Sequence, residues 1–163
     1  MILRCSLLIL LLLMSFVAAP VGASPQRLPL ELLQRLDIPT TELSHLKPKM
    51  IMLFEPDCRF CGLQRQQMEQ LQKYCPAVEQ WLVGINGTER ALKQQWQAWQ
   101  SRLPLYVADT VWLRQIGGVD ATPTTLFVSA DHQLLATHRG MLNQTQLLKA
   151  YQALSEAFCV LPN

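Results

Sequence analysis

The feature that most constrains this chain is an apolar segment that runs straight into a pair of cysteines. Apart from its first lysine, residues 49–54 are uniformly apolar and bounded by prolines, which predicts a central strand buried on both faces. Asp57 follows, placed to cap a helix over residues 58–74. Cys58 and Cys61 then occupy the first turn of that helix. Because residues three apart share a helix face, the two sulfur atoms are expected to meet.

A cysteine at a helix N-terminus is predisposed to react as a thiolate. Free backbone N–H groups and the positive end of the helix dipole lower a thiol pKa from about 8.5 to roughly 3.5–7.5. Cys58 comes first and is predicted to be the nucleophile, while Cys61 resolves the mixed disulfide and releases the substrate. Arg59 adds a cation beside the thiolate. Arg59 and Phe60 lie between the cysteines, where any substrate meets them.

The same C-x-x-C spacing also occurs in metal sites. Such sites normally need two further ligands with their own short spacing, whereas Cys75 and Cys159 stand alone and the histidines lie at 45, 132 and 138. Redox chemistry is therefore favoured, and neither a metal nor a cofactor is predicted. A carrier that holds a soft metal such as Cu(I) between Cys58 and Cys61 stays open as an alternative.

A second motif, Ala121-Thr122-Pro123-Thr124, leads directly into an apolar strand. Proline is tolerated at the first position of a strand, where its missing donor falls at the edge of the ladder. The motif predicts a cis-proline loop lying against Cys58, in which the Thr122 backbone pairs with an extended substrate strand.

The rest of the chain alternates between short apolar strands and capped helices. Further strands are expected over residues 81–85, 105–107, 124–129 and 133–138, and further helices over 88–102, 110–116 and 143–158. In the cysteine-bearing helix the apolar residues fall at positions 60, 63, 68 and 71. This order predicts an α/β fold with a mixed central sheet and helices on both faces.

The N-terminal part is interpreted separately from the fold. Residues 1–23 are predicted to be a signal peptide, cleaved near Ala23, because a charged start is followed by a short apolar run and small residues. An uncleaved membrane anchor is the alternative. Residues 24–48 are expected to form an N-terminal arm with a short helix over residues 30–36, and residues 49–163 the main domain.

The charge balance of the mature chain excludes some functions. One of the 14 basic residues is Arg4, in the signal, so 13 remain against 12 acidic residues, a net charge of +1. Such a balance provides no electrostatic footprint for nucleic acid or an anionic membrane. Function must therefore come from a specific site.

The segments Phe54–Cys61 and Gly118–Pro123 resemble the thioredoxin superfamily, and within it the periplasmic disulfide isomerases and oxidases called Dsb proteins. The resemblance implies a thioredoxin fold over residues 49–158 and a periplasmic thiol–disulfide oxidoreductase. Its substrates would be cysteine-containing envelope proteins, served by a membrane redox partner. Met52 stands where thioredoxin has a buried acid, and Phe60 replaces the histidine of the strong oxidase, which favours a reductase or isomerase.

Two further expectations follow from this resemblance. Only about 25 mature residues precede the domain, too few for the dimerisation domain of the isomerases, so a monomeric oxidoreductase is expected. An inactive thioredoxin-like subunit of an envelope secretion or transfer assembly is the other alternative. The thioredoxin arrangement also brings Cys75 and Cys159 within bridging distance, as a structural disulfide or as two free thiols.

Overall fold

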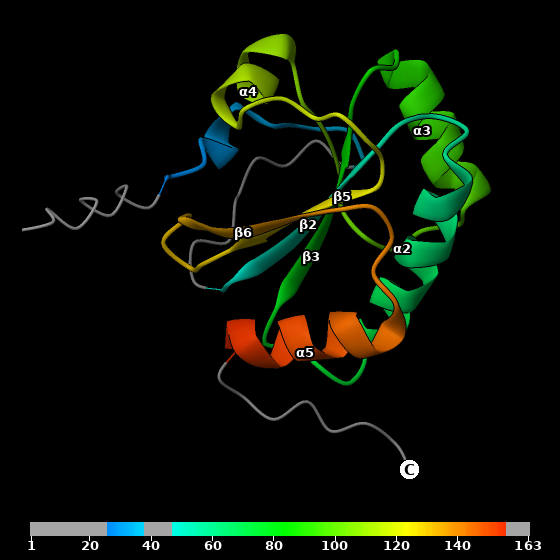
Figure 1. Cartoon of the computed structure of the whole chain (residues 1–163). Helices are drawn as coiled ribbons and strands as arrows, with labels where there is room; N and C mark the ends of the chain where they lie inside the picture. Colours follow the sequence, from blue (N-terminus) through cyan, green and yellow to red (C-terminus); the bar gives the residue numbers. More distant parts are fainter. Residues whose placement is uncertain (1–25, 38–46, 156–163) are drawn as a thin grey trace, which may run out of the picture.

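The computed structural model describes residues 26–37 and 47–155 of the chain. They form an α/β fold around one six-stranded sheet with the order β1-β4-β3-β2-β5-β6 (Figure 1). The strands are β1 (Gln34–Arg35), β2 (Lys49–Phe54), β3 (Glu79–Gly84), β4 (Leu105–Val107), β5 (Thr124–Val128) and β6 (Leu134–Arg139). The helices are the 3-10 turn η1 (Leu30–Leu32), α2 (Arg59–Gln72), α3 (Glu89–Ala98), α4 (Thr110–Gln115) and α5 (Gln144–Ser155).

The centre of the sheet is β2, whose six residues are all buried, as predicted. It pairs parallel with β3 and antiparallel with β5. The connections β2–α2–β3 and β3–α3–β4 step across the sheet in the same direction. Because such crossovers are right-handed, they place α2 and α3 on the same face. The predicted mixed sheet is therefore confirmed.

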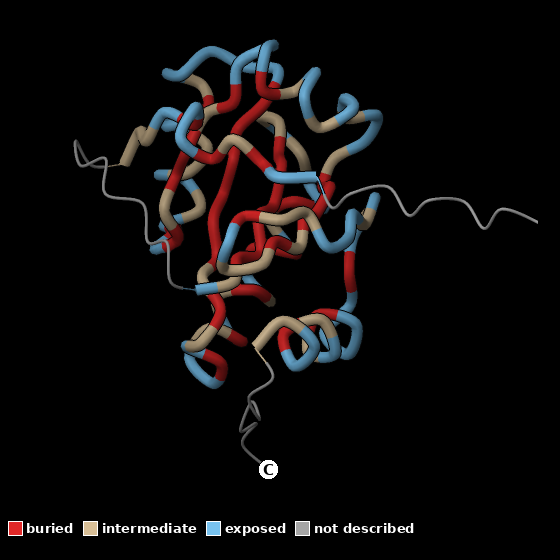
Figure 2. Tube along the Cα trace, turned by 90° about the vertical axis from the view of Figure 1, so that its left-hand side faces the viewer, coloured by how far each residue is buried: buried red, intermediate tan, exposed pale blue. Residues whose placement is uncertain are grey.

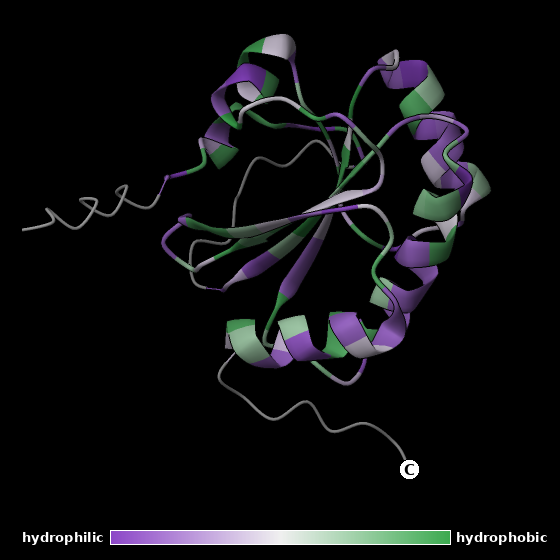
Figure 3. Ribbon diagram, viewed as in Figure 1, coloured by the Kyte–Doolittle hydropathy of each residue, from purple (hydrophilic) through white to green (hydrophobic). Residues whose placement is uncertain are grey.

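Each face of the sheet has its own core. On the α2 face, Met50 and Met52 of β2 pack with α2, α3 and α5, and Tyr151 of α5 belongs to this cluster. On the other face, Ile51 and Leu53 pack with α4 and the N-terminal segment. Figure 2 shows the buried residues gathered in the strands, and Figure 3 shows hydrophilic residues along the helices. Helices thus cover both faces, as expected.

The segment before β2 differs from the prediction. The expected helix over residues 30–36 is a single 3-10 turn, and the chain then extends into β1. There Gln34 and Arg35 pair antiparallel with β4, because the open edge of β4 supplies backbone partners that a short helix would lack. Buried leucines make this segment part of the second core, namely Leu28, Leu30 and Leu33.

Candidate redox site

The redox site begins where β2 leaves the sheet. Three residues separate the end of β2 from Cys58. Cys58 and Cys61 form a disulfide with an S–S distance of 2.03 Å. Cys58 is the N-cap of α2, and its sulfur accepts the Cys61 backbone N–H at 3.3 Å. Asp57 was expected to be the cap. Instead it adopts a left-handed φ of 61°, because the extended conformation that a cap needs falls one residue later.

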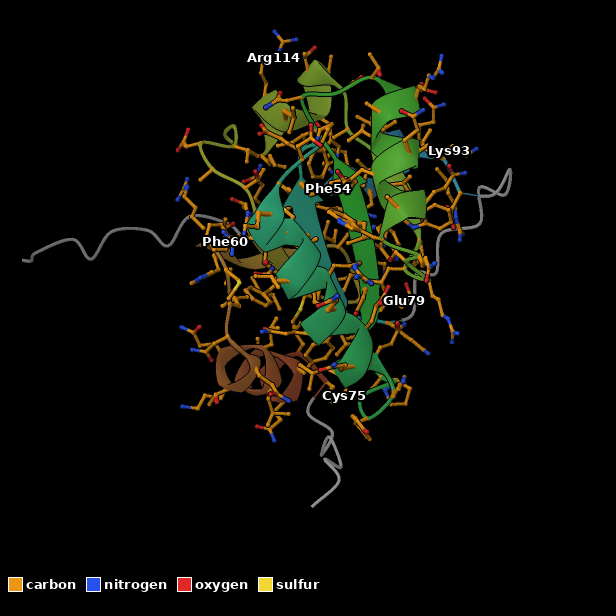
Figure 4. The ribbon with its side chains drawn as sticks, turned by 90° about the vertical axis from the view of Figure 1, so that its right-hand side faces the viewer. Phe54, Phe60, Cys75, Glu79, Lys93 and Arg114 are labelled. Atoms are coloured by element: carbon orange, nitrogen blue, oxygen red, sulfur yellow. A yellow bond between two sulfur atoms is a disulfide. The ribbon has the colours of Figure 1, made fainter. Side chains whose placement is uncertain are left out.

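The two sulfur-bearing residues differ in accessibility. Cys58 is half-buried, whereas Cys61 is fully buried in the core on the α2 face. Arg59 is exposed and Phe60 has 55% of its surface exposed, at the edge of the molecule beside the first turn of α2 (Figure 4). An incoming sulfur can therefore approach Cys58 but not Cys61, as a nucleophile paired with a resolving thiol requires.

Helix α3 supports the turn before Cys58, which sequence reasoning missed. The side-chain carbonyl of Gln95 accepts the Asp57 backbone N–H at 3.0 Å. Asn86, just before α3, donates its side-chain amide to the Glu55 carboxylate at 2.6 Å. Both residues act on a turn that lies about 30 to 40 positions earlier in the sequence, so no local pattern reveals them.

Trp99, just beyond α3, packs against the first turn of α2. Its ring centroid lies 5.0 Å from that of Phe54. A Cβ atom at Gly62 would approach the Trp99 Nε1 to 3.1 Å, so the glycine allows the indole to lie against the helix backbone. The tryptophan is half-buried, in keeping with a packing role.

The second motif, around Thr122 and Pro123, lies at the same end of the strands as Cys58. The Thr122–Pro123 peptide bond is cis, and Pro123 is buried. Strand β5 starts at Thr124, which pairs with Leu53 near the end of β2. The turn with Thr122 and Pro123 is thus at the end of β2 from which the chain passes to Cys58.

Among the described residues, no buried acidic side chain lies in the core around Cys61, the inner cysteine. Met52, at the position highlighted by the resemblance, is buried in the same core cluster as Cys61. No aspartate or glutamate is buried within residues 26–37 and 47–155. The polar side chain nearest in sequence on that helix face is the neutral amide of Gln64, which is fully buried.

Cys75 lies at the far end of α2 from Phe60 (Figure 4). It is buried and disulfide-bonded. Its pairing with Cys159 remains a prediction, because Cys159 lies outside the described residues.

No group of three or more His, Cys, Asp or Glu residues in the described part of the chain could hold a metal ion. None of the helices in that part is long and apolar enough to cross a bilayer.

The fold, the disulfide at the start of a helix and the cis-proline turn define a protein of the thioredoxin type. The family model described as a thioredoxin-like domain matches residues 38–155, which is most of the chain, and the chain belongs to that family. A search of the curated proteins finds no match.

Several solved structures have the same fold, and their names describe them as disulfide-exchange proteins. A thiol:disulfide interchange protein from Chlorobium tepidum has a TM-score of 0.66 and 17% identity, covering 81% of this chain and 97% of its own. DsbF from Mycobacterium tuberculosis has a TM-score of 0.63 and 23% identity, covering 78% and 98%. A secreted M. tuberculosis disulfide oxidoreductase homologous to E. coli DsbE has a TM-score of 0.57 and 20% identity, covering 66% and 82%. At these identities the likeness establishes the fold.

Proposed function

We propose that the protein is a thiol–disulfide oxidoreductase that exchanges disulfides with proteins of the bacterial periplasm through Cys58 and Cys61. The observation that carries this proposal is a disulfide at a helix N-terminus with one accessible and one buried cysteine. Membership of the thioredoxin-like family supports it.

Reduction of a substrate takes two displacements at sulfur. The Cys58 thiolate attacks a substrate disulfide, a Cys58–substrate disulfide forms, and the displaced substrate sulfur leaves and takes up a proton. Cys61 then loses its proton and attacks the Cys58 sulfur. The second substrate sulfur leaves as a thiol, and the Cys58–Cys61 disulfide seen here forms. The substrate gains two electrons and the cysteine pair loses them. Oxidation of a substrate dithiol is the same sequence reversed.

We infer that the reduced cysteine pair is the form that attacks substrates, as in a reductase, which passes two electrons to the substrate, or an isomerase, which rearranges its disulfides with no net electron transfer. Phe60 supplies no positive charge between the cysteines, so it stabilises the reduced thiolate less than a histidinium would. A less stabilised thiolate makes the pair a weaker oxidant. A dithiol partner in the membrane would return Cys58 and Cys61 to the reduced form.

The substrates we infer are cysteine-containing envelope proteins, bound by a monomer. An extended substrate segment would pair with the backbone of Thr122 beside cis-Pro123, and Arg59 and Phe60 would contact the residues around its cysteine. The predicted signal peptide, residues 1–23, lies outside the described residues. N-terminal sequencing of periplasmic protein tests it: a start near Ser24 supports export with cleavage, and a start at Met1 contradicts it.

The activity is tested by reduction of insulin disulfides with dithiothreitol as electron source. Wild-type protein should accelerate insulin reduction, Cys58→Ala should not, and Cys61→Ala should accumulate a mixed disulfide through Cys58. A wild-type protein that neither reduces insulin nor yields the trapped complex would be an inactive member of the family. Alkylation of the pair in cells then tests the direction: mainly reduced cysteines support a reductase or isomerase, and mainly oxidised cysteines an oxidase.

A further inference from the structure

Gln64 is a fully buried residue on the inner face of α2, three positions after Cys61. Both the nitrogen and the oxygen of its side-chain amide are hydrogen-bonded. Its Nε2 donates to the Thr125 hydroxyl at 2.6 Å, and its Oε1 accepts the Leu142 backbone N–H at 2.8 Å. One side chain therefore joins the helix that carries the disulfide to β5 and to the segment that leads into α5.

Both partners of Gln64 connect onward to the cis-proline turn. Thr125 follows Thr124, whose hydroxyl donates to the Ala121 carbonyl at 2.7 Å and so closes the turn before the proline. Leu142 lies two residues after Gly140, whose N–H donates to the Pro123 carbonyl at 2.8 Å. The turn is thus connected to the redox helix through Gln64 by two separate routes.

A neutral amide makes both connections without burying a charge. It offers a donor and an acceptor at once, whereas leucine offers neither, and a glutamate that accepted from both the Thr125 hydroxyl and the Leu142 N–H would have to bury its negative charge. A buried polar group that loses its partner keeps the full desolvation penalty, so each of these hydrogen bonds resists being broken. The other glutamines of α2 lack this environment. Gln66, for example, is exposed to solvent.

We propose that Gln64 is a positioning residue of the redox site, which holds the cis-Thr122–Pro123 turn at a set distance from Cys58. This rests on the oxidoreductase function proposed above and specifies how that site engages a polypeptide substrate. In the disulfide the Cys58 sulfur accepts the Cys61 N–H. After reduction, that N–H and the N-terminus of α2 are expected to stabilise the Cys58 thiolate locally. Gln64 therefore affects how a chain bound along the turn meets Cys58, and leaves the intrinsic reactivity of the sulfur unchanged.

The test compares two reactions of the Gln64→Leu protein. The first is reduction of insulin disulfides, followed as KM and kcat; the second is alkylation of reduced Cys58 by iodoacetamide, which needs no peptide groove. We expect kcat/KM for insulin to fall about tenfold. The loss should come mostly through KM, because a displaced turn pairs less well with the substrate chain. The alkylation rate and its pH profile should match the wild type.

Two control variants separate positioning from general destabilisation. Gln66→Leu makes the same chemical change on the exposed side of α2 and should alter neither reaction. Met68→Ala empties a buried position one turn further along the same face. It should lower the melting temperature without changing the ratio of the two rates.

A double-mutant cycle with Thr125→Val tests the hydrogen bond itself. Thr125→Val alone leaves the Gln64 donor buried without a partner, while the double variant removes both groups. The double variant should therefore be more stable than the two single effects predict, yet as slow with insulin as Gln64→Leu.

The proposal is overturned if Gln64→Leu reduces insulin at the wild-type rate or slows both reactions equally, or if Met68→Ala produces the same split. An active wild type with an unaffected Gln64→Leu variant removes only this inference. An inactive wild type removes the oxidoreductase function as well.

Discussion

Replacing Gly84 by alanine is expected to destabilise the protein by forcing α3 away from the sheet. Gly84 is the last residue of β3 and is buried beneath Leu92 of α3. A Cβ atom there would lie 2.5 Å from the Leu92 Cδ2 and 2.9 Å from its Cγ. Carbon atoms in contact normally sit about 3.5–4.0 Å apart, so the leucine or the whole helix must move by about 1 Å.

The size of this effect follows from the burial of Leu92, which is complete. Overpacking a core costs about 1–3 kcal/mol, and with both branches and the Cγ of the leucine in conflict we expect about 2 kcal/mol. That corresponds to a fall in melting temperature of roughly 4–8 °C for a protein of this length. Because α3 also carries Gln95, which holds the turn at Asp57, insulin reduction by the folded variant should slow as well.

Urea unfolding of the oxidised protein, followed by circular dichroism, measures the loss. The Leu92→Ala variant alone should lose about 2–5 kcal/mol because it leaves a cavity. In the Gly84→Ala/Leu92→Ala double variant the new methyl group occupies part of that cavity, so the double should lose clearly less than the sum of the singles. Additive losses, or a Gly84→Ala protein within about 0.5 kcal/mol of wild type, would refute the reasoning.

Three further measurements follow from the structure. The Tyr151 hydroxyl is buried without a hydrogen-bond partner among the described residues, and burial raises its pKa well above the ordinary value. Tyr151→Phe should thus be neutral or stabilising by up to about 1–3 kcal/mol. Above about pH 10, where only the unfolded tyrosine ionises, wild-type stability should fall more steeply with pH than that of the variant, and equal slopes in urea titrations at several pH values would contradict this. The alkylation rate of reduced Cys58 should reach half its maximum below about pH 8.5, the midpoint of a free thiol, so an unshifted midpoint speaks against thiolate stabilisation by α2. Peptide mapping without reductant should recover Cys75 linked to Cys159, and Cys159→Ser should cost about 4 kcal/mol less any strain; a different partner for Cys75 would disprove the pairing.

Local patterns were sufficient where a structural signal is carried by neighbouring residues. The apolar run at residues 49–54 predicted β2 correctly, because a strand buried on both faces needs no polar alternation. The helix that follows was predicted with its apolar positions at 60, 63, 68 and 71, yet Phe60 and Leu63 are exposed. The face that packs on the sheet passes through residues 61, 64, 68 and 71, so the polar Gln64 interrupts an apolar stripe. That interruption could have pointed to Gln64, but the predicted stripe at 60, 63, 68 and 71 missed it.

The sequence by itself determined the redox pair, because a turn that ends a buried strand and starts a helix places Cys58 and Cys61 together whatever the rest of the chain does. Only the tertiary structure decided what surrounds the pair. Gln95 reaches Asp57, and Gln64 reaches Thr125 and Leu142, across 38 to 78 residues of chain. Such hydrogen bonds depend on how helices pack against the sheet, and five glutamines along α2 look alike until that packing buries one of them.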